Sequence, residues 1–249
     1  MARKKKFRLN WKYVALALLA VVTFAVVAFA LRPVPTPEAA PFTPKPTLTP
    51  TPAATAEPLA LTGGAGEPLR VLFAGDSITV GRDASTREAS YRSLMTATLQ
   101  GARPVESDRI GNSGRTTTDV LPEALNAAET YGLLVVELGT NDVHKSTLPK
   151  FAADYPALLD ALRSKSPDAA LVCAGAWDKS PAAASVDRVI QAECVKRGGR
   201  FVPLSGFYAD KANQSTPGQP HWDGGQTDGN HPNDAGHRLI ADALLAQIS

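Results

Sequence analysis

Two short apolar runs in the second half of the chain constrain its fold more than any other feature. Residues 133–138 read LLVVEL and residues 169–176 read AALVCAGA, with no regular alternation of apolar and polar side chains. Strands that are apolar on both faces are typical of the centre of a parallel sheet that helices cover on both sides. The chain is therefore predicted to fold as an α/β protein.

Further short runs and longer helical patterns alternate with these two. Strands are predicted at residues 70–74, 104–110, 133–138, 169–176 and 200–204. Helices are predicted at residues 90–100, 118–131, 148–164, 183–196 and 233–247. Alternating strands and helices indicate a doubly wound, flavodoxin-like, three-layer α/β/α sandwich with a five-stranded parallel sheet.

The N-terminal region has the composition of a membrane anchor. Residues 1–32 contain seven basic residues and no acidic one, and residues 13–31 form a 19-residue stretch without charge. About 20 helical residues cross a bilayer core, and a basic flank favours the cytoplasmic side. We therefore predict a cytoplasmic tail at 1–12 and a transmembrane signal anchor at 13–31. A cleaved signal peptide is the alternative, because residues 28–30 read Ala-Phe-Ala.

A spacer and one globular domain follow the apolar stretch. Residues 33–58 contain nine Pro and six Thr, so residues 32–67 are predicted to be a semi-rigid, extended spacer. The domain is predicted at 68–249, outside the cytoplasm. Beyond residue 32 the chain has 19 basic and 24 acidic residues. That negative balance argues against nucleic acid as a partner.

Polar loops rich in small residues follow four elements of the predicted sheet. They read GDSIT at 75–79, GNSGRT at 111–116, GTND at 139–142 and DGNHPN at 228–233. In doubly wound sheets, ligands bind beyond the carboxyl ends of the strands. These loops are therefore expected to meet at one edge of the sheet and to build a site there.

The four loops resemble the conserved blocks of the SGNH (GDSL) hydrolases, a family named for a Ser, a Gly, an Asn and a His. Those positions fall here, in order, on Ser77, Gly114, Asn141 and His231. The resemblance covers about residues 68–249 and none of the anchor or spacer. It implies the SGNH hydrolase fold and a serine esterase with carbohydrate or lipid esters as substrates.

The residue types also suggest their chemistry. A serine hydroxyl is a weak nucleophile and needs a base, for which His231 is the best candidate beside Ser77. Asp228 lies three residues before His231 and is predicted to fix its tautomer, as in a Ser-His-Asp triad. Ester attack creates an oxyanion, and the expected donors are Ser77 N–H, a backbone N–H at Gly114 and the Asn141 amide.

Other polar residues have simpler interpretations. Asp76 is expected to shape the turn, His144 and His221 to be exposed loop residues, and His237 to belong to the last helix. One loop contains four residues that could bind a divalent metal ion: His221, Asp223, Asp228 and His231. Their spacing matches no compact site, so no metal and no cofactor are predicted.

Two cysteines, Cys173 on a predicted strand and Cys194 on the next predicted helix, leave two possibilities open. They pair in an oxidising exterior, or they are buried free thiols. The spacing alone does not decide between them, because pairing needs Cα atoms about 4.4–6.8 Å apart.

The leading hypothesis is hydrolysis of a carboxylic ester through an acyl-Ser77 intermediate. The tether favours small acyl groups on envelope carbohydrate as the substrate. An O-acyltransferase with the same triad is the first alternative, because a sugar hydroxyl can replace water. A catalytically silent glycan-binding module is the second, and the presence of Ser77, Asp228 and His231 together argues against it.

Overall fold

The computed structural model describes residues 57–62 and 66–249, which belong to one compact unit. The predicted tail, the predicted anchor at 13–31 and most of the predicted spacer lie outside the described residues. Among the residues that the structure describes, no helix is both long and apolar enough to cross a membrane.

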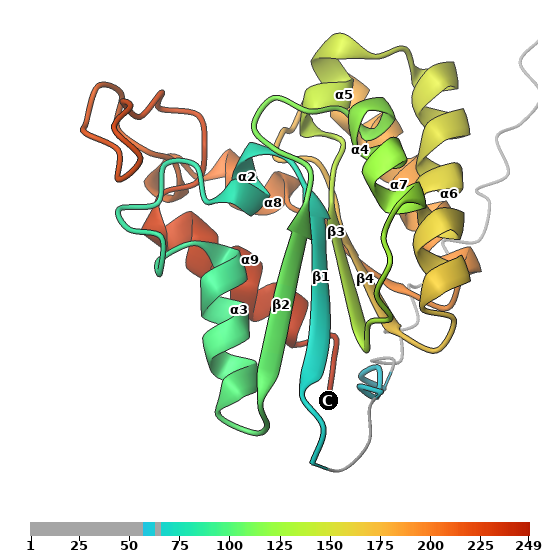
Figure 1. Ribbon diagram of the computed structural model, residues 1–249. Coiled ribbons are helices and arrows are strands. Elements are labelled where there is room, and N and C mark those ends of the chain that lie inside the picture. The colour runs from blue at the N-terminus through green and yellow to red at the C-terminus, as the bar shows by residue number, and fades with distance from the viewer. Residues whose placement is uncertain (1–56, 63–65) are drawn as a thin grey trace, which may run out of the picture. The chain divides into compact units, whose positions relative to one another are not determined.

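The described unit is built on a five-stranded parallel sheet, as predicted (Figure 1). The strands are β1 (Leu69–Gly75), β2 (Val105–Ile110), β3 (Leu133–Glu137), β4 (Ala170–Ala174) and β5 (Arg200–Val202). Their order in the sheet is β2-β1-β3-β4-β5, and every neighbouring pair is parallel. The order reverses at β1, between β2 and β3, so a crevice is expected at the carboxyl ends of β1 and β3.

Helices cover both faces of the sheet and form two hydrophobic cores. Figure 1 shows α3 (Tyr91–Gln100) and α9 (Asp234–Leu245) on one face, and α4 (Thr117–Leu125), α6 (Leu148–Lys165) and α7 (Pro181–Lys196) on the other. Successive side chains of a strand point to opposite faces. Val135 therefore packs in the core under α3 and α9, whereas Val136 packs under α4, α6 and α7.

Several predicted helix ends agree with the structure because a capping residue sets them. Ser90, Ser180 and Asn233 are the N-caps of α3, α7 and α9, and each side chain accepts a hydrogen bond from a backbone N–H of the first turn. Pro181 opens α7, two residues earlier than predicted, because the first helical position needs no N–H donor.

One predicted helix is too long, and the short helices were missed. The helix predicted at 118–131 ends at Leu125, because the Asn126 amide caps the Pro122 carbonyl and the chain then turns into β3. The missed helices are α2 (Ser77–Val80), α5 (Thr140–Lys145), α8 (Ser205–Ala209) and the 3₁₀ turn η1 (Lys211–Asn213). Each has six residues or fewer, too few to show a helical period.

The predicted domain start at residue 68 is too late. Leu59 N–H donates to Gln247 O at 2.8 Å, and Ser249 N–H donates to Leu59 O at 3.0 Å. Leu59 and Leu61 pack against the core under α3 and α9. Residues 57–62 therefore belong to the globular unit rather than to the spacer, because their two leucines find apolar partners beside the C-terminus.

A disulfide joins the sheet to a covering helix. Cys173 in β4 and Cys194 in α7 are bonded, with their Cα atoms 6.3 Å apart. Both residues are fully buried. Of the two possibilities that the sequence left open, the structure has the disulfide.

Candidate active site

The site lies at the switch point of the sheet, where β1 and β3 end. Asp76 follows the last residue of β1, and Ser77 is the first residue of α2. Asp76 is the N-cap of that short helix, and its Oδ1 accepts the Ile78 N–H at 3.0 Å. This contact fixes the turn that presents the Ser77 side chain, which agrees with the role predicted for Asp76.

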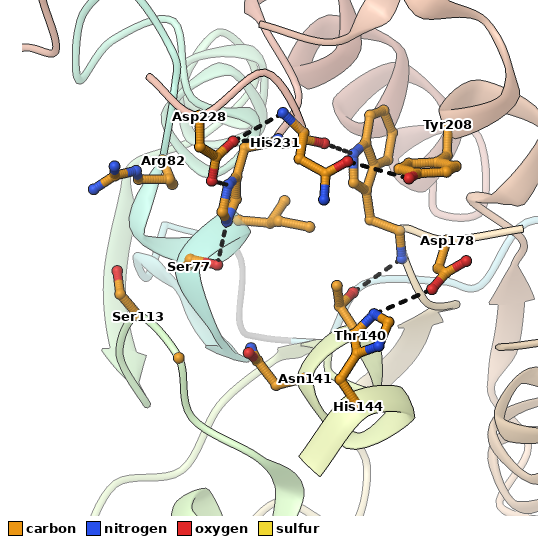
Figure 2. Close-up of a pocket in the computed structure, with 14 residues that line it drawn as sticks. Ser77, Arg82, Ser113, Thr140, Asn141, His144, Asp178, Tyr208, Asp228 and His231 are labelled. Atoms are coloured by element: carbon orange, nitrogen blue, oxygen red, sulfur yellow. Dashed lines mark hydrogen bonds and ion pairs between the residues drawn. The ribbon is translucent and has the colours of Figure 1, made fainter. Parts of the chain in front are cut away.

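Three of the predicted residues form a hydrogen-bonded series. Ser77 Oγ lies 2.7 Å from His231 Nε2, and His231 Nδ1 lies 2.6 Å from Asp228 Oδ2. Figure 2 shows the imidazole between the carboxylate and the hydroxyl. Because a carboxylate only accepts, Nδ1 carries the proton and Nε2 is free to accept the Ser77 proton.

The Asp228 carboxylate is ionised at neutral pH. Burial raises the pKa of Asp228, but the charge of His231 and hydrogen bonds from two backbone N–H groups outweigh it, and the pKa falls to about 2. Those donors are Asn230 N–H and His231 N–H, at 2.8 and 3.1 Å from Oδ1. The loop thus holds its own acceptor in place for the imidazole.

The three expected oxyanion donors line one cavity with this series. Asn141, on α5, donates one Nδ2 hydrogen to Asp76 Oδ2 at 2.9 Å. Its second Nδ2 hydrogen remains available to a group in the cavity. Among the described residues, neither Ser77 N–H nor Gly114 N–H donates to another group. All three donors are therefore available to an oxygen atom in the cavity.

Gly114 is needed for its backbone conformation. Its φ of +76° is a backbone conformation that residues with a side chain rarely adopt. Space is not the constraint, because a Cβ there would meet only Lys145 Nζ, at 3.4 Å. The Lys145 ammonium donates to Gly114 O at 2.7 Å. Nearby, the buried Asp142 carboxylate accepts the Thr117 N–H and hydroxyl, which ties α5 to the start of α4. The GTND segment therefore holds the loop that carries Gly114.

The cavity has a volume of about 360 Å³, and polar and apolar atoms line it in about equal measure. Across the cavity from Ser77 lies an aromatic pair, Trp177 and Tyr208, in edge-to-face contact with ring centroids 5.8 Å apart. Both are tied to Asn230: Trp177 Nε1 donates to its carbonyl and Tyr208 OH to its side-chain oxygen. Figure 2 shows Tyr208 across the cavity from Ser77.

The residues that hold the 215–231 loop against the segment after α2 were not predicted from the sequence. Asp83 has a φ of +64°, and its buried Oδ2 accepts the Asp228 N–H at 3.0 Å and the Ser215 hydroxyl at 2.5 Å. His221 Nε2 accepts the Asp83 N–H at 2.9 Å, and its Nδ1 contacts Asp223. The prediction that His221 is an exposed loop residue is therefore wrong, because this contact buries it.

The other two histidines lie elsewhere. His144 is exposed, as expected, but lies on α5 at the cavity wall, where Nε2 is 3.3 Å from Asp178 Oδ2. His237 is on α9, as predicted, and is buried. Burial lowers the pKa of His237 to about 4, and the neutral ring donates from Nε2 to Arg82 O.

The structure separates the four possible metal ligands of this loop into two pairs. His221 and Asp223 contact each other and the α2–α3 connection, whereas Asp228 and His231 face Ser77.

A serine, an imidazole and a carboxylate in series, facing three unpaired donors at the edge of a doubly wound sheet, have the geometry of a serine hydrolase. Sequence comparison identifies the family: the GDSL-like Lipase/Acylhydrolase family matches residues 73–239, more than half of the chain. The chain belongs to this family, which makes its class that of the carboxylic ester hydrolases. No match to a curated protein was found.

Solved structures with low sequence identity share the fold. A family two carbohydrate esterase from Clostridium thermocellum, solved with cellohexaose, has a TM-score of 0.54 at 20% identity, over 74% of this chain and 65% of its own. A Clostridium thermocellum family 3 carbohydrate esterase has a TM-score of 0.55 at 20% identity, over 71% and 93%. An acetyl xylan esterase from Geobacillus stearothermophilus has a TM-score of 0.52 at 20% identity, over 74% and 96%.

Proposed function

We propose that this chain is an extracytoplasmic serine esterase that removes small acyl groups from carbohydrate of the cell envelope. The observation that carries the proposal is the 2.7 Å contact between Ser77 Oγ and His231 Nε2, inside a cavity that also holds Asn141 and Gly114. In this proposal Ser77, His231 and Asp228 form the triad.

Acylation begins with attack of Ser77 Oγ on the ester carbonyl. His231 Nε2 takes the hydroxyl proton, and Asp228 stabilises the imidazolium through Nδ1–H. The carbonyl oxygen becomes an oxyanion and receives hydrogen bonds from Ser77 N–H, Gly114 N–H and the Asn141 amide. The bond to the alcohol then breaks, and the alcohol leaves with the proton from His231 Nε2.

Deacylation repeats these steps with water. His231 Nε2 takes a proton from water, and the hydroxide attacks the acyl carbon of acyl-Ser77. Collapse of the second tetrahedral intermediate releases the carboxylic acid, and Ser77 Oγ recovers its proton from His231.

The cavity favours a small acyl group. Its volume of about 360 Å³ lies near the lower end of the range of about 300–1,000 Å³ for small-molecule pockets. Apolar atoms, from side chains such as Ile78 and Trp177, make up about half of the wall, and polar atoms, including charged and amide groups, make up the other half. A long alkyl chain would lie against those polar groups without replacing their water.

Two observations support a carbohydrate as the alcohol part of the ester. The Trp177–Tyr208 pair combines apolar ring faces with fixed polar groups, which suits a sugar ring with its C–H and O–H groups. The three solved structures compared above are described as carbohydrate or acetyl xylan esterases. Another neighbour is a phospholipase A1 from Streptomyces albidoflavus, so the comparison leaves lipid esters to experiment.

A substrate panel tests this proposal directly. We expect kcat/KM of the purified protein to fall at least about tenfold from acetyl to octanoyl esters, because each methylene that does not fit costs binding energy. Acetylated oligosaccharides should be better substrates than acetylated simple alcohols. A preference for octanoyl or phospholipid esters would contradict the small-acyl assignment. Transfer of the acyl group to an added glycan, in place of release as free acid, would make the enzyme an acyltransferase.

The location outside the cytoplasm is part of the proposal. Residues 13–31 are uncharged and follow a basic flank, which favours export of the C-terminal part. The Cys173–Cys194 disulfide suits an oxidising compartment, because cytosolic thiols are mostly kept reduced.

Protease accessibility tests this topology. Protease added to spheroplasts of an expressing bacterium should digest residues 68–249 while the cytoplasmic control protein stays intact. After alkaline carbonate extraction, the uncleaved chain should stay with the membrane through residues 13–31. Full protection of the domain would contradict the exported topology. A soluble mature form that starts at Leu31 would replace the anchor with a cleaved signal peptide.

A further inference from the structure

A group of buried polar side chains lies behind Ser77, between the carboxyl ends of β1 and β3. It contains Asp76, Thr79, Tyr91 and Glu137, all fully buried. Glu137 is the last residue of the central strand β3, and its backbone pairs with Gly75 of β1. A carboxyl group at such a position is costly unless it is hydrogen-bonded or neutral.

The hydrogen bonds in this group run toward Glu137. Thr79 Oγ1 donates to Glu137 Oε2 at 2.9 Å, and it lies 2.7 Å from the Tyr91 hydroxyl. Because Thr79 has one proton and gives it to Glu137, the Tyr91 hydroxyl is the donor to Thr79. The donor series is therefore Tyr91, Thr79, Glu137.

The second carboxyl oxygen of Glu137, Oε1, indicates whether the Glu137 carboxyl is protonated. Glu137 Oε1 is buried and has no hydrogen-bond partner, and the fully buried Asp76 carboxyl lies near enough for its charge to act on Glu137. Two neighbouring buried carboxyl groups cannot both ionise at low cost, so one of them holds a proton. Asp76 already accepts Ile78 N–H and the Asn141 amide, so the proton belongs to Glu137. In agreement, burial and the charge of Asp76 raise the pKa of Glu137 well above its usual range.

We propose that Glu137 is a positioning residue of the active site: as a neutral acid it donates a hydrogen bond to Asp76, and Asp76 in turn holds the Asn141 amide and the turn after Ser77. The proposal rests on the esterase function proposed above. It extends the active site one layer behind the cavity, since Glu137 does not line the cavity and reaches substrate only through Asp76 and Asn141.

Ionisation of Glu137 would place a second negative charge against Asp76 and weaken its hold on Asn141. Among the described residues, titratable groups that interact with this pair include Tyr91 and Tyr155, and, through Asp76, His231 and Asp142. Burial raises the pKa of both phenols, so both are neutral. No cation among them offsets an ionised Glu137, apart from His231 when it is protonated.

The experiment compares Glu137→Gln, Glu137→Leu and the control Val136→Ala, which shortens a buried side chain of the same strand on its other face. Gln keeps a donor for Asp76 and an acceptor for Thr79, so kcat should stay within about threefold of the unmutated enzyme, and the loss of activity at alkaline pH should shift upward by at least about one pH unit. Leu removes the donor, so kcat should fall about 10- to 100-fold with little change in KM. Val136→Ala should lower stability with an unchanged pH profile.

A second readout does not depend on activity. Since the folded-state pKa of Glu137 is raised, its proton stabilises the fold below the usual Glu pKa of 4.5, and this stabilisation is lost as pH rises toward the folded-state value. Gln does not titrate, so the Tm of Glu137→Gln relative to the unmutated protein should rise by about 3–5 °C per pH unit above pH 4.5.

The outcomes separate this inference from the proposed function. A constant Tm difference across pH would overturn the neutral Glu137, whatever the activity. The positioning role would be overturned if activity at alkaline pH is lost at the same pH in Glu137→Gln as in the unmutated enzyme, or if Glu137→Leu and Val136→Ala have equal kcat. Neither result would contradict the proposed esterase function. If no ester is cleaved by the unmutated protein, the proposed function fails and the Tm comparison decides the state of Glu137.

Discussion

Replacing His231 by Ala should lower the rate at which a fluorophosphonate probe labels Ser77 by about 10⁴–10⁶-fold, with a similar loss in kcat for ester hydrolysis. The reason is the 2.7 Å contact: no other described base lies in hydrogen-bond reach of Ser77 Oγ apart from the Asp76 carboxylate, at 3.5 Å. Asp76 Oδ1 already accepts the Ile78 N–H and lies 0.8 Å farther from Ser77 Oγ than His231 Nε2 does, since 3.5 − 2.7 = 0.8. Intact-protein mass after timed probe treatment measures the labelling, and peptide mapping locates the adduct.

The matched control is His144→Ala, because His144 is the other histidine of the cavity wall and is exposed. It should label at nearly the rate of the unmutated protein. His221→Ala is a poorer control than the sequence suggested, because His221 holds Asp83 and the loop that carries Asp228. Asp228→Asn should reduce labelling by up to about 10⁴-fold, since an amide no longer fixes the Nδ1–H tautomer. An adduct on a residue other than Ser77 would overturn the serine-esterase mechanism.

Replacing Asn141 by Ala should lower kcat by about 10²–10³-fold and leave KM nearly unchanged. One Nδ2 hydrogen of Asn141 is fixed on Asp76, and the other is directed to the cavity, where the oxyanion forms only in the transition state. The measurement is a full set of steady-state constants on an acetyl ester.

Asn230→Ala is the matched control for this substitution. Asn230 is a second amide on the cavity wall, but its side-chain oxygen accepts the Tyr208 hydroxyl, so its loss should mainly raise KM by loosening the aromatic pair. If Asn141→Ala raises KM alone, Asn141 binds the ground-state ester and the oxyanion assignment is wrong.

The strands and the loops between them could be predicted from the sequence, because short stretches of residues indicate each of them. Buried parallel strands such as β3 are apolar on both faces, and helices such as α7 and α9 begin at side chains that cap them. Once the strands are parallel, their carboxyl ends must share an edge, which predicts that Ser77, Asn141 and His231 meet. The short helices and the place of residues 57–62 escaped, because fewer than two helical turns or a pair of leucines leave no period to read.

The sequence by itself determined the sheet, the order of the catalytic-type residues and the family, since all of these follow from local periodicity and short motifs. Only the tertiary structure decided that Cys173 pairs with Cys194, that His221 supports Asp83, and that Thr79 donates to the buried Glu137. The Thr79–Glu137 and Asp83–His221 contacts join residues 58 and 138 positions apart. Such contacts depend on strand register and on how the loops pack, and a hydrogen bond forms only when both fix its two atoms to within a few tenths of an ångström.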